Sequence, residues 1–245
     1  YYLGLSLFRL GNYHEAMKNF DAALVQVPEC ALALYYKARA LALLTMHNEA
    51  INAYDSAITQ KETFTEAWLY RGISHAGLDH YDRALKDYDH ALSLDRGYAS
   101  AFLYKGIALN HLNRYAEAIQ SFKDAIAIQP DYPDVYYHLG LALLEQKNYR
   151  DAISSFDQTL AFNKKYAGAH VQKGIALSHL QNYEESVVEF NTALKIQPDY
   201  EEACYERGRS QLHLGKYKEA INSFDMVLAS NPGNAKAIYE KGRAY

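Results

Sequence analysis

The 34 residues from 99 to 132, ASAFLYKGIALNHLNRYAEAIQSFKDAIAIQPDY, decide the fold because their pattern returns along the whole chain. Gly106 recurs as a small residue every 34 positions, and Ala118 and Phe122 follow it at fixed offsets of 12 and 16. A period of this length is typical of a solenoid of stacked repeats. The small residues that share the slot of Gly106 are Gly4, Ala38, Gly72, Gly106, Gly140, Gly174, Gly208 and Gly242.

Each period predicts two antiparallel helices. Phe102, Gly106 and Leu112 mark one face of the first helix, whereas Ala118 and Phe122 mark one face of the second. A small residue in each helix lets the two backbones approach closely, and the aromatic ring fills the space beside them. Neither helix can bury its apolar stripe alone, so each pair must stack on its neighbours. The sequence therefore predicts an all-α solenoid of stacked antiparallel helix pairs.

The residues of this period resemble the tetratricopeptide repeat (TPR) family. Trp68 stands four positions before Gly72, and the small residue, the aromatic and the proline that follow match the family's 34-residue signature. The resemblance covers the whole chain and implies a single array that winds as a right-handed superhelix. The array is divided into a partial repeat 1–30, complete repeats 31–64, 65–98, 99–132, 133–166, 167–200 and 201–234, and a partial repeat 235–245.

The resemblance also implies where a partner binds. In the family, the first helices line a concave groove that holds a protein or peptide segment, and slots 2, 5, 6, 9, 12 and 13 of each repeat face it. Exposed aromatic stripes are typical of interaction surfaces, but a tyrosine here could instead pack against the next repeat. For any one tyrosine both interpretations stay open. The residues carried over as candidate peptide-binding residues are Tyr35, Tyr36, Arg39, Tyr70, Ile73, Tyr104, Ile107, His111, Tyr137, Leu141, Tyr205 and Arg209, with Arg39 and Arg209 expected to steer acidic groups.

Two alternative functions stay open. The pattern begins and ends inside a first helix, so we expect the array to be an excerpt of a longer one. It would then serve as the targeting or regulatory arm of a larger, possibly catalytic, protein. The second alternative is end-to-end self-association through terminal helices.

Composition narrows the class of partner. The chain has 245 residues, is 49% hydrophobic and 22% charged, and carries a net charge of -4. These values exclude global disorder and provide no basic excess for nucleic acid. No apolar run reaches the roughly 18 residues that a membrane-spanning helix needs, so we expect no membrane partner. The two cysteines, Cys30 and Cys204, do not make a disulfide framework, which favours a reducing, cytoplasmic location.

The histidines do not predict chemistry. His111, His179 and His213 share one slot of their repeats, about 10 Å apart between adjacent repeats by ordinary helix packing, too far to share a zinc ion. They are expected to be solvated. His75 has no carboxylate or cysteine partner at ligand spacing, and His170 occupies a slot that other repeats fill with aromatics, which indicates packing. The sequence thus predicts no catalytic residue, no metal site and no cofactor, and hence not an enzyme.

Overall fold

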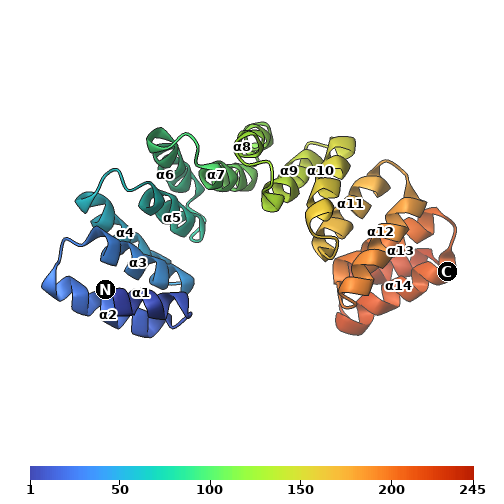
Figure 1. Cartoon of the computed structure of the whole chain (residues 1–245). Coiled ribbons are helices and arrows are strands. Elements are labelled where there is room, and N and C mark those ends of the chain that lie inside the picture. Colours follow the sequence, from blue (N-terminus) through green and yellow to red (C-terminus); the bar gives the residue numbers. More distant parts are fainter. The chain divides into compact units, whose positions relative to one another are not determined.

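The computed structural model describes all 245 residues and consists of 15 helices without a strand. The chain divides into two compact units, residues 1–130 and 131–245. The N-terminal unit holds α1 (Tyr2–Arg9), α2 (Tyr13–Gln26), α3 (Ala31–Leu43), α4 (His47–Gln60), α5 (Thr65–Ala76), α6 (Tyr81–Leu94), α7 (Ala99–His111) and α8 (Tyr115–Ile128) (Figure 1). The C-terminal unit holds α9 (Pro133–Glu145), α10 (Tyr149–Phe162), α11 (Ala167–His179), α12 (Tyr183–Ile196), α13 (Glu201–His213), α14 (Tyr217–Ser230) and α15 (Ala235–Arg243).

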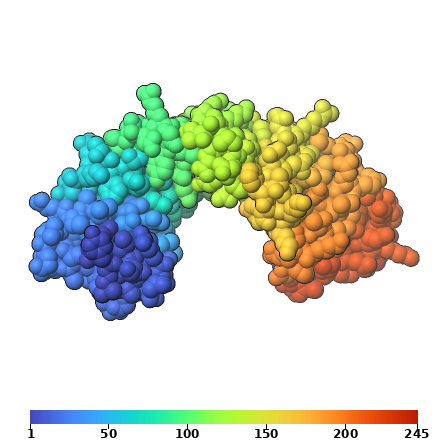
Figure 2. Space-filling model, viewed as in Figure 1, coloured from blue at the N-terminus to red at the C-terminus, as the bar shows by residue number.

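Within each unit, successive helices pack as a series of pairs. Each odd-numbered first helix packs on the even-numbered second helix that follows it, and the second helix packs on the first helix of the next repeat. Figure 2 shows the surface of the same N-terminal unit, coloured blue to green, in a space-filling view. The expected all-α solenoid of stacked helix pairs is therefore confirmed.

The core of each pair is the contact between the small residue and the aromatic ring. A Cβ atom added to Gly106 would lie 2.5 Å from Cε1 of Phe122, closer than real Cβ contacts allow. Phe122 itself is completely buried. The same aromatic slot is fully buried in every repeat, by Phe20, Tyr54, Tyr88, Phe122, Phe156, Phe190 and Phe224.

The turn inside each repeat uses a left-handed residue at one fixed slot. Gly11 and Gly215 take φ of 80° and 71° there, which glycine adopts without steric cost. The residue after this slot closes the helix end in Schellman fashion, as where the amide of Met46 donates to the carbonyl of Leu41 at 2.9 Å. Five repeats place a non-glycine residue in the slot: Thr45, Asp79, Asn113, Lys147 and Gln181.

Ion pairs connect the second helix of one repeat to the first helix of the next. Lys105 on α7 reaches back to Asp89 on α6, with Nζ and Oδ1 2.7 Å apart, and Lys173 on α11 reaches Asp157 on α10 at the same distance. Lys37 and Asp21, Arg71 and Asp55, and Lys241 and Asp225 form the equivalent pairs. The basic residues one position before the small residue therefore join one repeat to the next.

Candidate interaction surface

The first helices of the N-terminal unit present one continuous row of candidate residues. Helices α1, α3, α5 and α7 contact one another in series, so side chains at equivalent slots are neighbours. We call the row the first-helix face; in this unit it consists of Tyr36, Arg39, Tyr70, Ile73, Tyr104, Ile107 and His111, all of them at least partly exposed. Seven of the candidate peptide-binding residues are therefore accessible to a partner on this unit.

Tyr35 does not belong to that face. Its side chain is only 5% exposed, and its ring centroid lies 4.8 Å from that of Phe64 and 6.0 Å from that of Tyr70. Burial raises the pKa of its hydroxyl well above the usual value. The packing alternative therefore holds for Tyr35. Leu69 and Leu103, which occupy the same slot in the next two repeats, are buried as well.

Arg39 is the cation at the centre of the N-terminal part of this face. Its guanidinium carbon lies 4.1 Å from the ring centroid of Tyr70 and 5.5 Å from that of Phe8. It also hydrogen-bonds to Tyr35 and has no carboxylate as an ion-pair partner. A cation held over aromatic rings keeps its positive charge while its position is restricted. Arg39 can therefore offer a placed guanidinium to an acidic group.

The aromatic side chains of the first-helix face are themselves packed. The ring of Tyr36 lies 5.5 Å from that of Phe8 and 6.2 Å from that of Phe20, and the ring of Tyr104 lies 6.4 Å from that of Tyr88. Such contacts limit side-chain motion before a partner arrives, which lowers the entropy lost on binding. This part of the face is thus aromatic, ordered and positively charged.

The shared histidine slot is a stacking site between repeats, not merely a solvated position. His111 stacks on Tyr81 of the preceding repeat, with centroids 4.7 Å apart and planes within 6°. His179 on Tyr149 and His213 on Tyr183 repeat the geometry at 4.6 Å and 4.5 Å. The signal in the sequence is a tyrosine 30 positions before each histidine.

The C-terminal unit carries the remaining candidates, Tyr137, Leu141, Tyr205 and Arg209. All four are at least partly exposed. The ring of Tyr137 lies 4.9 Å from that of Tyr166, and burial raises the pKa of Tyr137. Its ring is thus partly shielded by the neighbouring repeat.

Arg209 is not a free cation. Its Nη1 lies 2.9 Å from Oε2 of Glu206 on the same helix, and Arg243 pairs with Glu240 in the same way. Glu206 therefore offsets the charge with which Arg209 was expected to steer acidic groups. Arg209 and His213 are shared by two small pockets of about 260 and 230 Å³.

An acidic pocket lies on the same side of the C-terminal unit. Its volume is about 450 Å³, and it is lined by Glu201, Glu202, Tyr205, Glu206, Asn234 and Lys236. Three glutamates face one lysine there. The first-helix side of this unit therefore differs in charge from the Arg39 region of the N-terminal unit.

Two histidines have partners that the sequence interpretation missed. Nδ1 of His170 lies 2.6 Å from Oε2 of Glu189, so the expectation of simple packing is wrong. Nε2 of His75 lies 4.0 Å from Oδ2 of Asp87. Both carboxylates lie on the second helix of the same repeat, 19 and 12 residues away, so each contact depends on how the two helices pack.

The structure contains no group of three or more histidine, cysteine, aspartate or glutamate residues arranged to hold a metal ion. Every helix is also too short or too polar to cross a bilayer.

Comparisons with known protein families match most of the chain. A family model described as tetratricopeptide repeat matches residues 1–63 and 137–201, and another of the same description matches 65–98 and 201–234. A third, described as TPR repeat, matches residues 106–147. The comparison with curated proteins found no match.

Solved structures with the same fold are similar at low sequence identity. YrrB, described as a TPR protein with an unusual peptide-binding site, is 22% identical with a TM-score of 0.67, over 78% of this chain and 98% of YrrB. The Cut9–Hcn1 hetero-tetramer of the APC/C is 20% identical with a TM-score of 0.78, over 98% of this chain and 48% of that chain. PilF of Pseudomonas aeruginosa is 16% identical with a TM-score of 0.77, over 88% of this chain and 98% of that chain. At these identities the likeness shows the fold alone.

Proposed function

Because the chain belongs to the tetratricopeptide repeat family, whose members typically mediate protein–protein interaction, we propose that it is a scaffold that binds a peptide segment of a partner protein on its first-helix face. The observation that carries the proposal is Arg39, held 4.1 Å above the ring of Tyr70 without a carboxylate partner. A guanidinium in this setting binds a carboxylate through two parallel hydrogen bonds. The segment we propose is therefore acidic where it meets the N-terminal unit.

The neighbouring side chains supply the apolar part of the contact. Tyr36, Tyr70, Ile73 and Tyr104 are partly exposed and lie on successive first helices. Tyrosine offers a large contact area at little entropic cost, which is why it is common in binding hot spots. The peptide-binding site that the name of YrrB mentions agrees with a peptide ligand for this fold.

A displayed peptide library tests the proposal. The intact chain should select peptides enriched in Asp and Glu, and Arg39→Gln should lose that enrichment while its helicity stays unchanged. Tyr70→Ala combined with Tyr104→Ala should weaken binding of the selected peptides about a hundredfold, as expected when two hot-spot aromatics are removed.

The matched control changes exposed residues of α8 that lie off this face, Gln120→Ala with Lys123→Ala. Selected peptides that bind the double tyrosine variant as tightly as the control would show that the first-helix face is not the binding surface.

A further inference from the structure

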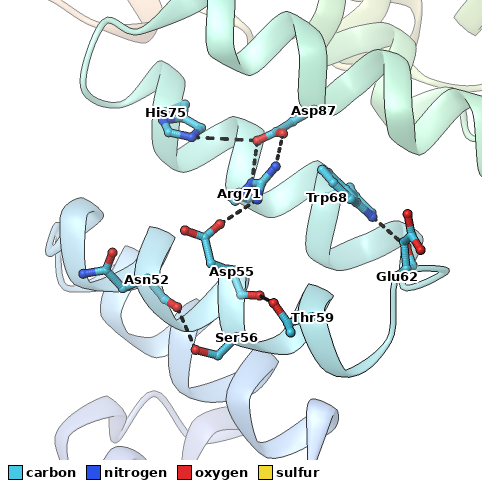
Figure 3. A network of polar contacts seen from close by, with 9 residues as sticks. All are labelled: Asn52, Asp55, Ser56, Thr59, Glu62, Trp68, Arg71, His75 and Asp87. Atoms are coloured by element: carbon cyan, nitrogen blue, oxygen red, sulfur yellow. Dashed lines mark hydrogen bonds and ion pairs between the residues drawn. The ribbon is translucent and has the colours of Figure 1, made fainter.

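An open pocket of about 730 Å³ lies in the N-terminal unit. Side chains of the second helices α4 and α6 line it, together with side chains of the first helix α5. This volume falls in the range of small-molecule sites, about 300 to 1,000 Å³. Figure 3 shows the polar network at its base, where Arg71 lies between two aspartates. The lining residues that matter for a ligand are Asn48 and Asn52 from α4, Trp68 and His75 from α5, and Arg83 and Lys86 from α6.

The repeat that forms most of this pocket departs from its neighbours at the pocket itself. His75 occupies a slot that holds leucine in five other repeats, namely Leu7, Leu41, Leu109, Leu143 and Leu177. Arg83 occupies a slot that is acidic in all six others, namely Glu15, Glu49, Glu117, Asp151, Glu185 and Glu219. Because those repeats form the same helix pair with the opposite chemistry, the fold does not require either residue.

His75 costs stability in its slot. It is only 9% exposed, and its Nδ1 is buried without a hydrogen-bond partner. Burial lowers the pKa of His75, which favours the neutral ring with its single N–H donor, and Nε2 lies 4.0 Å from Oδ2 of Asp87, beyond hydrogen-bond distance. A leucine there would bury more apolar surface and leave no polar atom unsatisfied. His90 shows a second such atom, because its Nε2 is also buried without a partner.

The charges of the pocket favour an anion. Asp55 and Asp87 are both paired with Arg71, at 2.6 Å from Nη1 to Oδ1 of Asp55 and 3.0 Å from Nε to Oδ2 of Asp87. Arg83 and Lys86, one turn apart on α6, form no ion pair. The side-chain amides of Asn48 and Asn52 lie on α4 across the pocket. The groups that remain free to bind are therefore cations and neutral hydrogen-bond donors.

We propose that the pocket between α4 and α6 binds a small molecule through an oxyanion group, a phosphate or a carboxylate. Arg83 and Lys86 hold the oxyanion from α6, and the imidazole N–H of His75 and the amides of Asn48 and Asn52 donate to it. Arg71 pairs with both aspartates, and together with Arg83 and Lys86 it gives the pocket lining three cations against two carboxylates. This site lies apart from the first-helix face and does not depend on the proposed function.

Trp68 provides the measurement, because it is the only tryptophan of the chain and lines the pocket. The intact chain is titrated with sodium phosphate, O-phosphoserine and succinate at constant ionic strength, and Trp68 fluorescence is followed. We expect a saturable change with phosphate and phosphoserine, or with succinate as well. The first result assigns the site to phosphate groups, and the second assigns it to oxyanions in general. Absence of saturation with all three ligands overturns the proposal.

Two variants separate binding from folding. Arg83→Glu restores the acid of the other repeats and should weaken the affinity at least about tenfold, the loss expected for one charge-assisted hydrogen bond. Arg96→Glu changes the charge of the same unit equally at an exposed residue outside the pocket, and should leave the affinity unchanged. An equal loss in both variants overturns the proposal, because it would reflect net charge alone.

His75→Leu is a further variant, and it restores the residue that five other repeats carry. We expect it to raise the melting temperature and to weaken oxyanion binding together. Unchanged affinity in a folded His75→Leu variant would contradict the role of His75 in the site.

Discussion

At the scale of single residues, the repeat pattern alone is sufficient to predict the contact made by the small residue of each repeat. The sequence predicts close approach of two helices at Gly106, and the 2.5 Å that would separate an added Cβ from the ring of Phe122 gives the reason. The glycine can be recognised in the sequence because the same steric requirement recurs in every repeat. The carboxylates beside His75 and His170 cannot be predicted in this way, because they depend on which side chain of the facing helix lies close enough.

Gly106→Ala tests the steric requirement. We expect it to reduce the free energy of unfolding by about 1 to 3 kcal/mol through overpacking against the buried ring of Phe122, despite the better helix propensity of alanine. Urea denaturation followed by circular dichroism measures the change. Gly242→Ala is the matched control, since a Cβ there meets nothing within 4 Å. Equal effects at the two positions would disprove the steric explanation.

Thr45 should carry local strain, because it is a β-branched residue with φ of 61° in the turn slot. Replacing it by glycine should raise the free energy of unfolding by about 0.5 to 1 kcal/mol, since glycine adopts this φ freely but loses more entropy on folding. The same denaturation measurement applies. Thr63→Gly, in an exposed turn without a positive φ, should instead be neutral or destabilising.

His170 and Glu189 should make stability depend on pH. The hydrogen bond with Glu189 raises the pKa of His170, so its contribution is complete below about pH 6.5 and is lost as the pH rises through the folded-state pKa. Although burial opposes it, the hydrogen bonds from His170 and Lys173 lower the pKa of Glu189. The contribution of Glu189 is therefore lost as the pH falls through its own folded-state pKa.

His170→Gln isolates this effect. The difference in unfolding free energy between wild type and variant should be largest in mildly acidic solution and should shrink toward alkaline pH. A difference that stays constant from about pH 5 to 9 would mean that protonation of His170 does not contribute.

At the scale of helices, the sequence predicts the elements better than the contacts between them. Successive first helices begin 34 residues apart, as the period of the sequence does. These are α3, α5, α7, α9, α11, α13 and α15. Helix starts follow from the periodic pattern, which each repeat carries within itself. The stack between Tyr149 and His179 joins two repeats, so the 30-residue spacing of the two residues acquires a meaning only once the packing of one repeat on the next is known.

A double-mutant cycle on Tyr149 and His179 measures that stack. We expect a coupling free energy of about 0.5 to 1.5 kcal/mol, the usual value for an aromatic pair, when each residue is replaced by alanine singly and together. The replacements are compared by urea denaturation. Additive losses would show that the near-parallel rings do not stabilise the contact between α10 and α11.

At the scale of the whole molecule, the net charge of -4 conceals separate regions of opposite sign. The free cations Arg39, Arg83 and Lys86 belong to the N-terminal unit, whereas three glutamates line a pocket of the C-terminal unit. Composition excludes a uniformly basic surface correctly but cannot show this distribution. A charged side chain is available to a ligand only if it is not already paired with an opposite charge in the protein.

The two proposed sites use different sides of α5 and should therefore act independently. Tyr70 and Ile73 lie on the first-helix face, whereas Arg71 and His75, about 150° away around the helix on average, line the pocket. Arg39→Gln should abolish the preference for acidic peptides without changing the phosphate affinity, and Arg83→Glu should do the reverse. The effects of well-separated substitutions normally add, so the double variant should show both losses in full. If saturating phosphate displaced the selected peptides from the wild-type chain, the two ligands would be sharing one surface, and the assignment of two separate sites would be wrong.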